Sequence, residues 1–316
     1  MKIAILSNGP GNYSTKRLKE VALERGHEVE VIKYKECYAS IAQSNPGVSY
    51  RGEDLGHYDA IIPRIASYMT RYGTAIVRQL EMQGMYTISG SLAISRSRDK
   101  LRSMQLLTKA GVGIPKTVFS RNSADIDDLI DKLDGTPVII KLARGTHGNG
   151  VVLAETKKAA KSVLQAFYLT NEDGTNILIQ EFVKESAGVD IRAFVVGGRA
   201  GVDIRAFVVG GRVVASMKRQ SLDDDFRSNL HKGGEGTPVK LTLEERKMCV
   251  KAAKAMGLNV AGVDFMRSER GALILEVNAS PGFGIEKITG RDVATPIIEY
   301  IEQNAKRRPK KDKIGA

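Results

Sequence analysis

Gly262-Val-Asp-Phe265 and Leu275-Glu-Val-Asn-Ala-Ser-Pro-Gly282 are the two stretches that decide the fold of this chain. Glu276 and Asn278 lie two residues apart in an apolar run, so on a strand both side chains point to one face. Asp264 lies on the preceding segment, and the residues between the stretches are typical of a hairpin turn. Carboxylates and a side-chain carbonyl suit Mg²⁺, which completes its shell with substrate phosphates. A polar strand face satisfied by water is the alternative, but the three donors and the turn together favour a metal.

Bulk composition indicates a globular protein of two or three domains. The chain has 316 residues, of which 42% are hydrophobic and 27% charged. No apolar run approaches the ~20 residues that span a bilayer, and the first residues turn polar too soon for a signal peptide. Cys37 and Cys249 show no metal-type spacing, which fits a reducing cytoplasm. The net charge of +12 permits binding to nucleic acid, ribosomes or acidic peptides, and is equally compatible with a solvated basic surface.

We expect residues 1–95 to form an α/β domain. Ser14 is expected to cap the first helix, which stops at Gly26. Alternation of strand and helix patterns predicts an open, mostly parallel sheet. The expected strands are Ile3–Leu6, Val29–Ile32 and Ala60–Pro63, and the expected helices are Thr15–Arg25 and Gly73–Met82.

The pattern changes near residue 96, and we expect two further domains. A central domain over 96–184 mixes short helices with strands, and a domain over 185–305 is rich in strands and then helical. Residues 306–316 are a basic tail that we expect to be disordered. The expected central elements are the helices Lys100–Ala110, Asp125–Lys132 and Ala159–Tyr168 and the strands Pro137–Lys141, Val151–Leu153 and Ile177–Phe182.

An internal repeat interrupts the last domain. Residues 187–199 recur without a single change as residues 200–212. Each copy is typical of a strand followed by a Gly-Gly turn, but only one copy can occupy a given place in a sheet. We expect the second copy to fill the sheet, because it keeps its link to the next strand, Val213–Arg219. The other copy would be a surplus loop or an added hairpin, and identical side chains leave the register ambiguous.

Two lysines are candidates for binding phosphate. Lys141 ends a strand before the glycine-rich segment Gly145–Gly150, whose backbone N–H groups can approach phosphate oxygens closely. Gly-Lys-Ser/Thr is missing, so this is not a Walker loop. Lys100 is a second candidate cation. Taken alone, the loop is as compatible with a simple hairpin, and Lys100 with a surface lysine.

Other segments suit the rest of a nucleotide. Gln180–Val183 ends a strand and can offer backbone groups to an adenine edge, while Asp190 or Asp203 could bind a ribose hydroxyl. Arg227 and Asn229 lie in a donor-rich segment and could hold a transferring phosphoryl group. An ordinary strand end and a flexible polar loop are the alternatives.

Together these segments resemble the ATP-grasp superfamily, and more closely the RimK group of glutamate ligases, over about residues 1 to 303. The most particular segments are Ser97–Leu107, Gly145–Glu155, Asp225–His231 and Glu276–Gly282. The resemblance implies an α/β fold that is α+β in its C-terminal part. An N-terminal α/β domain would precede a small lid domain and a C-terminal domain, with ATP between the lid and the C-terminal domain.

The resemblance also implies a role for each candidate residue. The residues implied for the ATP phosphates are Lys100, Lys141, Arg227, Ser228 and Asn229, of which Arg227 and Asn229 would be catalytic. Those implied for the adenine hinge are Glu181 and Phe182, and for ribose Asp190 or its copy Asp203. Two Mg²⁺ or Mn²⁺ ions would be held by Asp264, Glu276 and Asn278, and Arg64 would bind the acceptor carboxylate.

The implied activity is ATP-dependent ligation of L-glutamate to the acidic C-terminal tail of a small-subunit ribosomal protein, through an acyl phosphate. The resemblance further implies a cytoplasmic homotetramer that needs no direct contact with nucleic acid. Two alternatives stay open: a ligase for a small molecule or carrier protein, and a ribosome-associated binding protein silenced by its repeat. Ser89-Gly-Ser91 replaces a segment that usually contains Asn, which leaves the acceptor contacts open.

Overall fold

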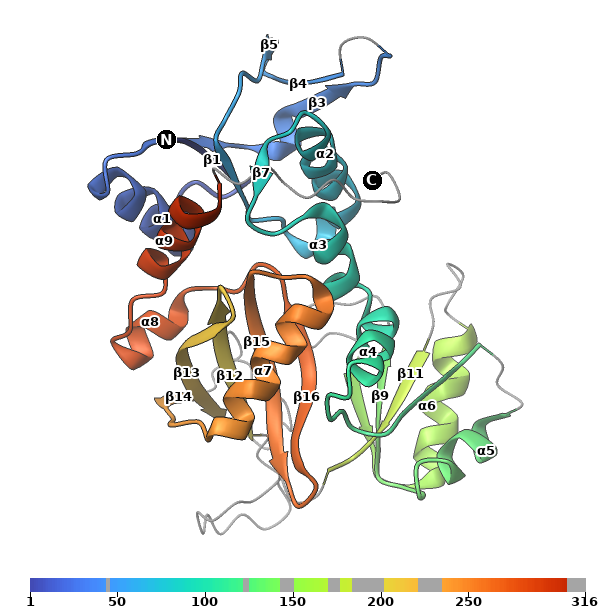
Figure 1. The fold of residues 1–316 in the computed structure, drawn as a ribbon. Coiled ribbons are helices and arrows are strands. Elements are labelled where there is room, and N and C mark those ends of the chain that lie inside the picture. The colour runs from blue at the N-terminus through green and yellow to red at the C-terminus, as the bar shows by residue number, and fades with distance from the viewer. Residues whose placement is uncertain are drawn as a thin grey trace.

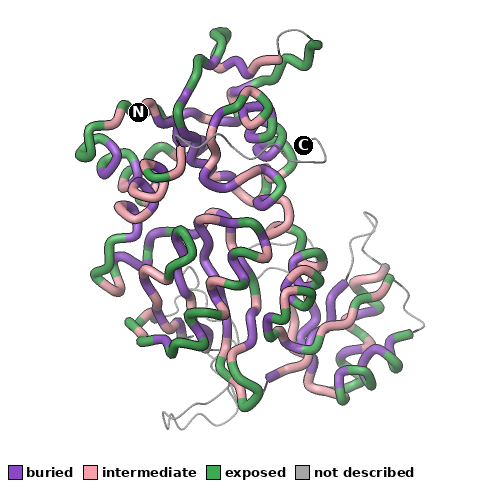
Figure 2. Tube along the Cα trace, viewed as in Figure 1, coloured by how far each residue is buried: buried purple, intermediate pink, exposed green. Residues whose placement is uncertain are grey.

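The computed structural model describes residues 1–43, 46–121, 125–142, 151–169, 177–183, 202–220 and 235–305. Within these ranges the strands form four sheets (Figure 1). Buried residues run along the strands, and exposed residues gather on loops and on the outer sides of helices (Figure 2). No helix in these ranges is long and apolar enough to cross a membrane.

The first sheet is parallel, with the strand order β2-β1-β6-β7, which confirms the expected α/β arrangement. Its strands are β1 (Lys2–Leu6), β2 (Glu28–Ile32), β6 (Ala60–Pro63) and β7 (Tyr86–Thr87). The helices beside it are α1 (Tyr13–Glu24), α2 (Thr70–Met82) and α3 (Ser91–Arg98), and a short 3-10 turn, η2 (Ser67–Met69), precedes α2. The apolar run Ile3–Leu6 is wholly buried, as a central parallel strand requires.

Two features of this region differ from the expectation. Ser14 does not cap α1, because Asn12 occupies the N-cap position and makes no side-chain cap, while the Ser14 hydroxyl accepts a hydrogen bond from Arg64.

A small antiparallel sheet, β3-β4-β5, lies beside α2 and was not predicted. It consists of β3 (Cys37–Ser40), β4 (Gly47–Tyr50) and β5 (Glu53–Asp54), after the turn η1 (Tyr34–Glu36). Such short strands carry too little alternation to stand out in a sequence.

The central sheet is antiparallel, with the order β10-β9-β11-β8. Its strands are β8 (Thr117–Ser120), β9 (Val138–Leu142), β10 (Val151–Ala154) and β11 (Ile177–Glu181), and its helices are α5 (Ile126–Asp131) and α6 (Lys157–Leu169). Ile140, Ile177 and Ile179 belong to the core that this sheet shares with its two helices. Because side chains alternate along β9, Lys141 points to the opposite face, away from those helices.

The largest sheet, called sheet D below, is antiparallel with the order β14-β13-β12-β15-β16. Its strands are β12 (Val202–Val209), β13 (Arg212–Gln220), β14 (Glu235–Pro238), β15 (Val260–Ser268) and β16 (Gly271–Asn278). Helix α7 (Leu243–Met256) covers one face, and α4 (Lys100–Lys109) joins sheet D to the central sheet (Figure 1). Helix α7 begins at a capping box between Thr242 and Glu245 and ends at the left-handed Gly257.

Strand β12 consists of residues of the second repeat copy, which confirms that this copy fills the sheet. It pairs with β13 through the Gly210-Gly211 turn, where both residues have positive φ, and with β15 on its other side. The first copy, residues 187–199, lies outside the described residues.

The chain then returns to its beginning through α8 (Gly284–Thr289) and α9 (Ala294–Asn304). Helix α9 packs against α1, and Ile297, Ile298 and Ile301 join Ile3 and Ile5 in one core (Figure 1). At the surface the Glu302 carboxylate accepts hydrogen bonds from the Arg25 guanidinium, at 2.8 and 2.7 Å. The last helix therefore completes the core of the first sheet.

Candidate active site

The face of sheet D that is turned away from α7 carries the predicted metal ligands. Asp264 of β15 lies opposite Glu276 of β16, and Asn278 lies opposite Gly262. A bulge after Asp264 shifts the register of these two strands. The neighbours Val263 and Val277 belong to the core shared with α7, so Asp264, Glu276 and Asn278 share the other face. The prediction that Glu276 and Asn278 point to one face of a strand is therefore confirmed.

Asp264 is held by two guanidinium groups. Arg205 binds both of its oxygens, with Nε to Oδ1 at 2.7 Å and Nη2 to Oδ2 at 2.5 Å. Arg219 Nη2 lies 3.0 Å from Asp264 Oδ2, and Arg219 also donates to Asp203, with Nε to Oδ1 at 2.7 Å. Asp203, Arg219 and Asp264 are each less than 9% exposed. Four charges thus alternate in sign across three neighbouring strands.

This network fixes the charge of Asp264. Burial alone raises the pKa of its carboxyl group, but Arg205 and Arg219 outweigh burial and hold the pKa at about 2. The carboxylate is therefore ionised at any physiological pH, as a metal ligand must be.

Glu276 and Asn278 are more accessible than Asp264. Asn278 donates from Nδ2 to Glu276 Oε1 at 2.7 Å, which leaves the amide oxygen of Asn278 able to face a cation. The described residues contain no group of three His, Cys, Asp or Glu side chains that could hold a metal. A site here therefore needs the Asn278 oxygen as its third donor, and this all-oxygen set fits Mg²⁺.

Five cations lie near enough to the Glu276 carboxylate to feel its charge. Burial lowers the pKa of Arg98, Lys100 and Lys141, and the Glu276 charge opposes this shift. Burial also acts on Arg205 and Arg219, but Asp264 and the neighbouring carboxylates outweigh it, so the pKa of both is raised. These side chains come from α3, α4, the central sheet and sheet D, so three parts of the fold converge on one carboxylate. Such a concentration of positive charge suits a polyphosphate.

The two predicted phosphate lysines take part in this convergence. Burial lowers the pKa of Lys141 to about 8, with Glu276 opposing the effect. Lys141 donates to Gln180 Oε1 on the adjacent strand, and Lys100 Nζ donates to the Leu142 carbonyl at 3.0 Å. Both ammonium groups therefore lie at the open end of β9.

Glu181 joins the central sheet to sheet D. Its Oε1 accepts from the Lys116 backbone N–H at 2.6 Å and from Arg270 Nη2 at 2.5 Å, and Arg270 lies in the β15–β16 turn. The Phe182 N–H donates to the Pro137 carbonyl at 3.3 Å. The place predicted for adenine is therefore the junction of the two sheets, and its role as a hinge stays a prediction.

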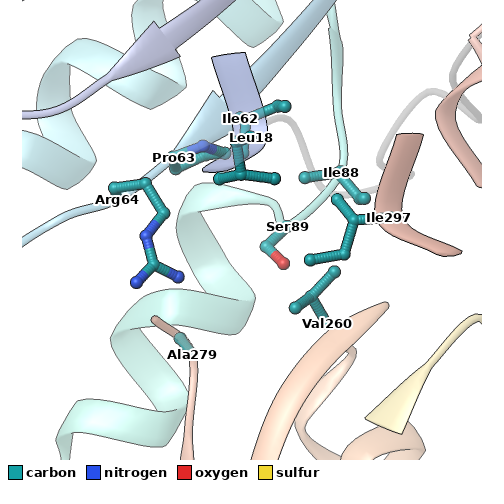
Figure 3. A pocket seen from close by; sticks show the side chains of 9 residues that line it. All are labelled: Leu18, Ile62, Pro63, Arg64, Ile88, Ser89, Val260, Ala279 and Ile297. Atoms are coloured by element: carbon teal, nitrogen blue, oxygen red, sulfur yellow. The ribbon is translucent and has the colours of Figure 1, made fainter. Parts of the chain in front are cut away.

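Arg64 lies where the first sheet meets sheet D. Its Nη2 donates to the Pro281 carbonyl at 2.8 Å, and its guanidinium lies over the Phe283 ring at 5.3 Å. Figure 3 shows the side chain pointing away from Ile88 and Ile297, which line a cavity of about 10 Å³. Such a cavity holds at most one water, so it is not the substrate pocket.

Polar atoms near this junction lack partners. Arg98 Nη2 donates to the Ile65 carbonyl at 2.9 Å, but Arg98 Nε is buried with no hydrogen-bond partner among the described residues. Ser280 Oγ, which follows the metal strand, is in the same state. Buried polar groups without partners are rare in proteins and indicate a place for a ligand or water.

Four predicted site residues and the glycine-rich segment cannot be placed. They lie outside the described residues and are Gly145–Gly150, Asp190, Arg227, Ser228 and Asn229. Asp203, the alternative ribose residue, is described, and Arg219 engages both of its oxygens.

Sequence reasoning missed Arg98, Arg205 and Arg219. A signal for Arg205 was present, because Asp203 and Arg205 alternate with Ile204 and Ala206 along one strand. Charged side chains on one face of a strand whose other face is apolar indicate a site or a buried ion pair.

Comparison with known proteins identifies the family. The RimK PreATP-grasp domain matches residues 1–94, and the RimK-like ATP-grasp domain matches residues 97–202 and 198–301. The second match is divided within the repeat, as expected when one copy is additional. A probable alpha-L-glutamate ligase 2 of Shewanella frigidimarina is 54% identical over 306 residues, covering 96% of this chain and 97% of the relative. A probable alpha-L-glutamate ligase of Aliivibrio fischeri is 55% identical over 306 residues, covering 96% of each.

Solved structures agree on the fold. The ATP-grasp ligase PsnB, complexed with minimal precursor, Mg and ADP, superposes with a TM-score of 0.70 at 18% identity, covering 97% of this chain and 98% of that one. The resemblance inferred from the sequence and the ATP-grasp fold are both confirmed. The chain belongs to the RimK-like ATP-grasp family, with a RimK pre-ATP-grasp domain preceding its ATP-grasp domain.

Proposed function

We propose that this chain is an ATP-dependent ligase that joins L-glutamate to the carboxylate of an acidic protein acceptor. The relatives of 54 and 55% identity are named as alpha-L-glutamate ligases, which supports glutamate as the amine substrate. The observation that carries the proposal is the gathering of Arg98, Lys100 and Lys141 near Glu276, beside Arg205 and Arg219, which Asp264 and Asp203 already compensate. An anionic substrate such as a polyphosphate suits three largely buried cations beside one exposed carboxylate.

In the proposed reaction the acceptor carboxylate attacks the γ-phosphoryl group of ATP in line. This forms an acyl phosphate and releases ADP. The glutamate amine then attacks the acyl carbon, which forms the amide and releases phosphate. Lys141 and Lys100 offset the charge on the phosphate oxygens. The acceptor carboxylate is itself the nucleophile, so no side chain of the enzyme has to become covalently attached.

Asp264, Glu276 and Asn278 would hold Mg²⁺ or Mn²⁺, as two ions, which would neutralise charge on the phosphates. Arg205 and Arg219 keep Asp264 ionised and fix the position of its carboxylate. We assign Arg227, Ser228 and Asn229 to the phosphates, Glu181 and Phe182 to adenine, and Asp203 or Asp190 to ribose.

The carboxylate substrates would lie at the junction with the first sheet. Arg64 and Arg98 supply the positive charge there, and the buried Arg98 Nε and Ser280 Oγ supply donors that no described residue satisfies. We assign the acceptor carboxylate to Arg64. The acceptor that we propose is the acidic C-terminal tail of a small-subunit ribosomal protein, modified in the cytoplasm by a homotetramer.

The test is ADP release with ATP, Mg²⁺ and glutamate, with and without the purified ribosomal protein, followed by mass spectrometry of that protein. Mass increases in steps of one glutamate are expected. ADP release only with a small acceptor would replace the protein acceptor by a small molecule. No nucleotide turnover with any acceptor would contradict the ligase proposal.

A further inference from the structure

A second charged surface lies on the opposite side of sheet D from the candidate active site. It is a groove of about 420 Å³ between the β12–β13 turn and α7. The residues that line it are Gly211, Arg212, Val213, Arg246, Lys247 and Val250. Val208, which pairs with Val213, and Ala252 belong to the core between sheet D and α7, so the groove is on the α7 side.

The groove is lined by three cations and no carboxylate. Arg212, Arg246 and Lys247 are exposed, and none of them forms an ion pair with any residue that the structure describes. Other exposed arginines of the described residues do pair with a carboxylate, as Arg25 does with Glu302 and Arg267 with Glu245. The three cations are thus available to an anionic partner.

The positive charge continues along α7. Arg246, Val250 and Lys254 are spaced four residues apart and lie on one face of the helix. The Lys254 Cε lies 3.8 Å from the position that a Cβ on Gly211 would take, so this lysine borders the same turn. The result is a basic track with an apolar floor formed by the half-buried Val213 and Val250.

We propose that this groove binds the acidic polypeptide chain of the acceptor. The inference rests on the proposed function, because it assigns a second binding surface to the same substrate. The cations can pair with the carboxylates of successive acidic residues. The two valines can pack against the methylene groups of the same side chains. The lining contains no aromatic side chain on which a nucleic-acid base could stack, so a peptide fits better than RNA.

Binding here adds affinity without touching the chemistry. The groove and the Asp264 carboxylate lie on opposite faces of one sheet, so an acidic segment in the groove leaves the metal ligands uncovered. Each glutamate added to the acceptor also adds a carboxylate, so the affinity of the groove for the product rises as the tail grows.

The test compares the variant R212Q/R246Q/K247Q with the control K16Q/K19Q/R78Q in the full chain. The control removes three exposed cations from α1 and α2, far along the chain from the groove. The probes are a fluorescein-labelled oligo-glutamate peptide, the matching oligo-glutamine peptide and a labelled single-stranded RNA, followed by fluorescence anisotropy. Circular dichroism establishes that each variant is folded.

We expect the groove variant to bind oligo-glutamate about tenfold more weakly than the wild type, and the control to bind it normally. The charge-conserving variant R212K/R246K/K247R should restore binding, and oligo-glutamine should not bind. Equal oligo-glutamate affinity in the groove variant and the wild type would overturn the proposal. Loss of RNA binding with unchanged peptide binding would do the same, and would assign the groove to nucleic acid.

Turnover separates this proposal from the proposed function. With an acidic-tailed acceptor, the groove variant should show about a tenfold higher KM for acceptor and an unchanged kcat. If the wild-type protein binds oligo-glutamate through the groove but releases no ADP, the ligase proposal is contradicted and the groove proposal stands. If the wild-type protein turns over and the groove variant has the same KM for acceptor, only the groove proposal is contradicted.

Discussion

The Arg205 guanidinium binds both carboxylate oxygens of Asp264, at 2.7 and 2.5 Å, on the face of sheet D opposite α7. Both side chains are largely buried, and Arg219 approaches the same carboxylate from the next strand but one. Asp264 therefore has a structural role in addition to the metal role that we propose for it.

Replacing Asp264 by Asn should reduce both stability and activity. The substitution leaves Arg205 and Arg219 without the carboxylate that compensates them in a buried place, which costs about 3 kcal/mol of the free energy of unfolding. Urea titration measures this loss, and ADP release measures the activity. An Asp264→Asn variant as stable as the wild type would show that the ion pairs contribute nothing net.

Replacing Glu276 should affect activity alone. This side chain is exposed, so Glu276→Gln should change the free energy of unfolding by no more than about 0.5 kcal/mol. ADP release should fall at least about a hundredfold, because a ligand charge opposite the phosphates is lost. Glu244→Gln, which removes an exposed carboxylate from α7, is the matched control and should keep full activity. Full turnover of Glu276→Gln at saturating Mg²⁺ would refute the metal assignment.

Lys141 should take up a proton when ATP binds near pH 8. Burial holds its pKa at about 8, so the ammonium is charged below that pH and increasingly neutral above it. Polyphosphate favours the charged form, so binding raises the pKa, and the KM for ATP should rise as the pH passes above 8.

Calorimetric titration with ATP at pH 8 in two buffers of different ionisation enthalpy measures this uptake. In Lys141→Arg the guanidinium is always charged, so the uptake from this position should vanish. A binding enthalpy independent of buffer in the wild type would contradict the assignment of Lys141 to the phosphates.

One repeat copy should be dispensable. Deleting residues 187–199 and deleting residues 200–212 produce the same polypeptide, because the copies are identical. The shortened chain retains every residue of β12, so it should fold with an unchanged or higher thermal midpoint and keep its ligase activity. A deletion variant that fails to fold would show that both copies are required.

Two matched substitutions test which copy occupies the sheet. Phe207 in β12 is wholly buried and packs edge to face on Phe283, so Phe207→Ala should cost about 3 kcal/mol. Phe194→Ala makes the same change in the first copy and should cost far less. Equal, small losses in both variants would indicate that either copy can form the strand.

The site was partly predictable from the sequence. A period of two placed Glu276 and Asn278 on one face, and the apolar run around them identified the strand. The guanidinium partners of Asp264 were not foreseen, because Arg205 and Arg219 are distant in sequence and only strand pairing brings them to Asp264. Periodicity identifies the face of a strand, whereas pairing partners depend on the order of strands in the sheet.

The fold was predictable to a similar degree. The buried strand Ile3–Leu6 and the turn before Gly271 have strong local signals, and both are confirmed. The prediction that Ser14 caps α1 was wrong, because the Ser14 hydroxyl accepts a hydrogen bond from Arg64, which lies fifty residues away in the chain. Local sequence patterns therefore predict where helices and strands lie, whereas their end residues also depend on hydrogen bonds to distant parts of the chain.

The packing of α9 on α1 has a consequence for how the protein is made. The strands of the first sheet leave the ribosome early, but Ile297, Ile298 and Ile301, which cover part of their core, are synthesised near the end. The nascent chain therefore exposes part of the hydrophobic surface of the first sheet through most of its translation. We therefore expect the amino-terminal domain to reach its native state only after α9 has emerged, and a chain truncated before residue 294 to expose this core and aggregate.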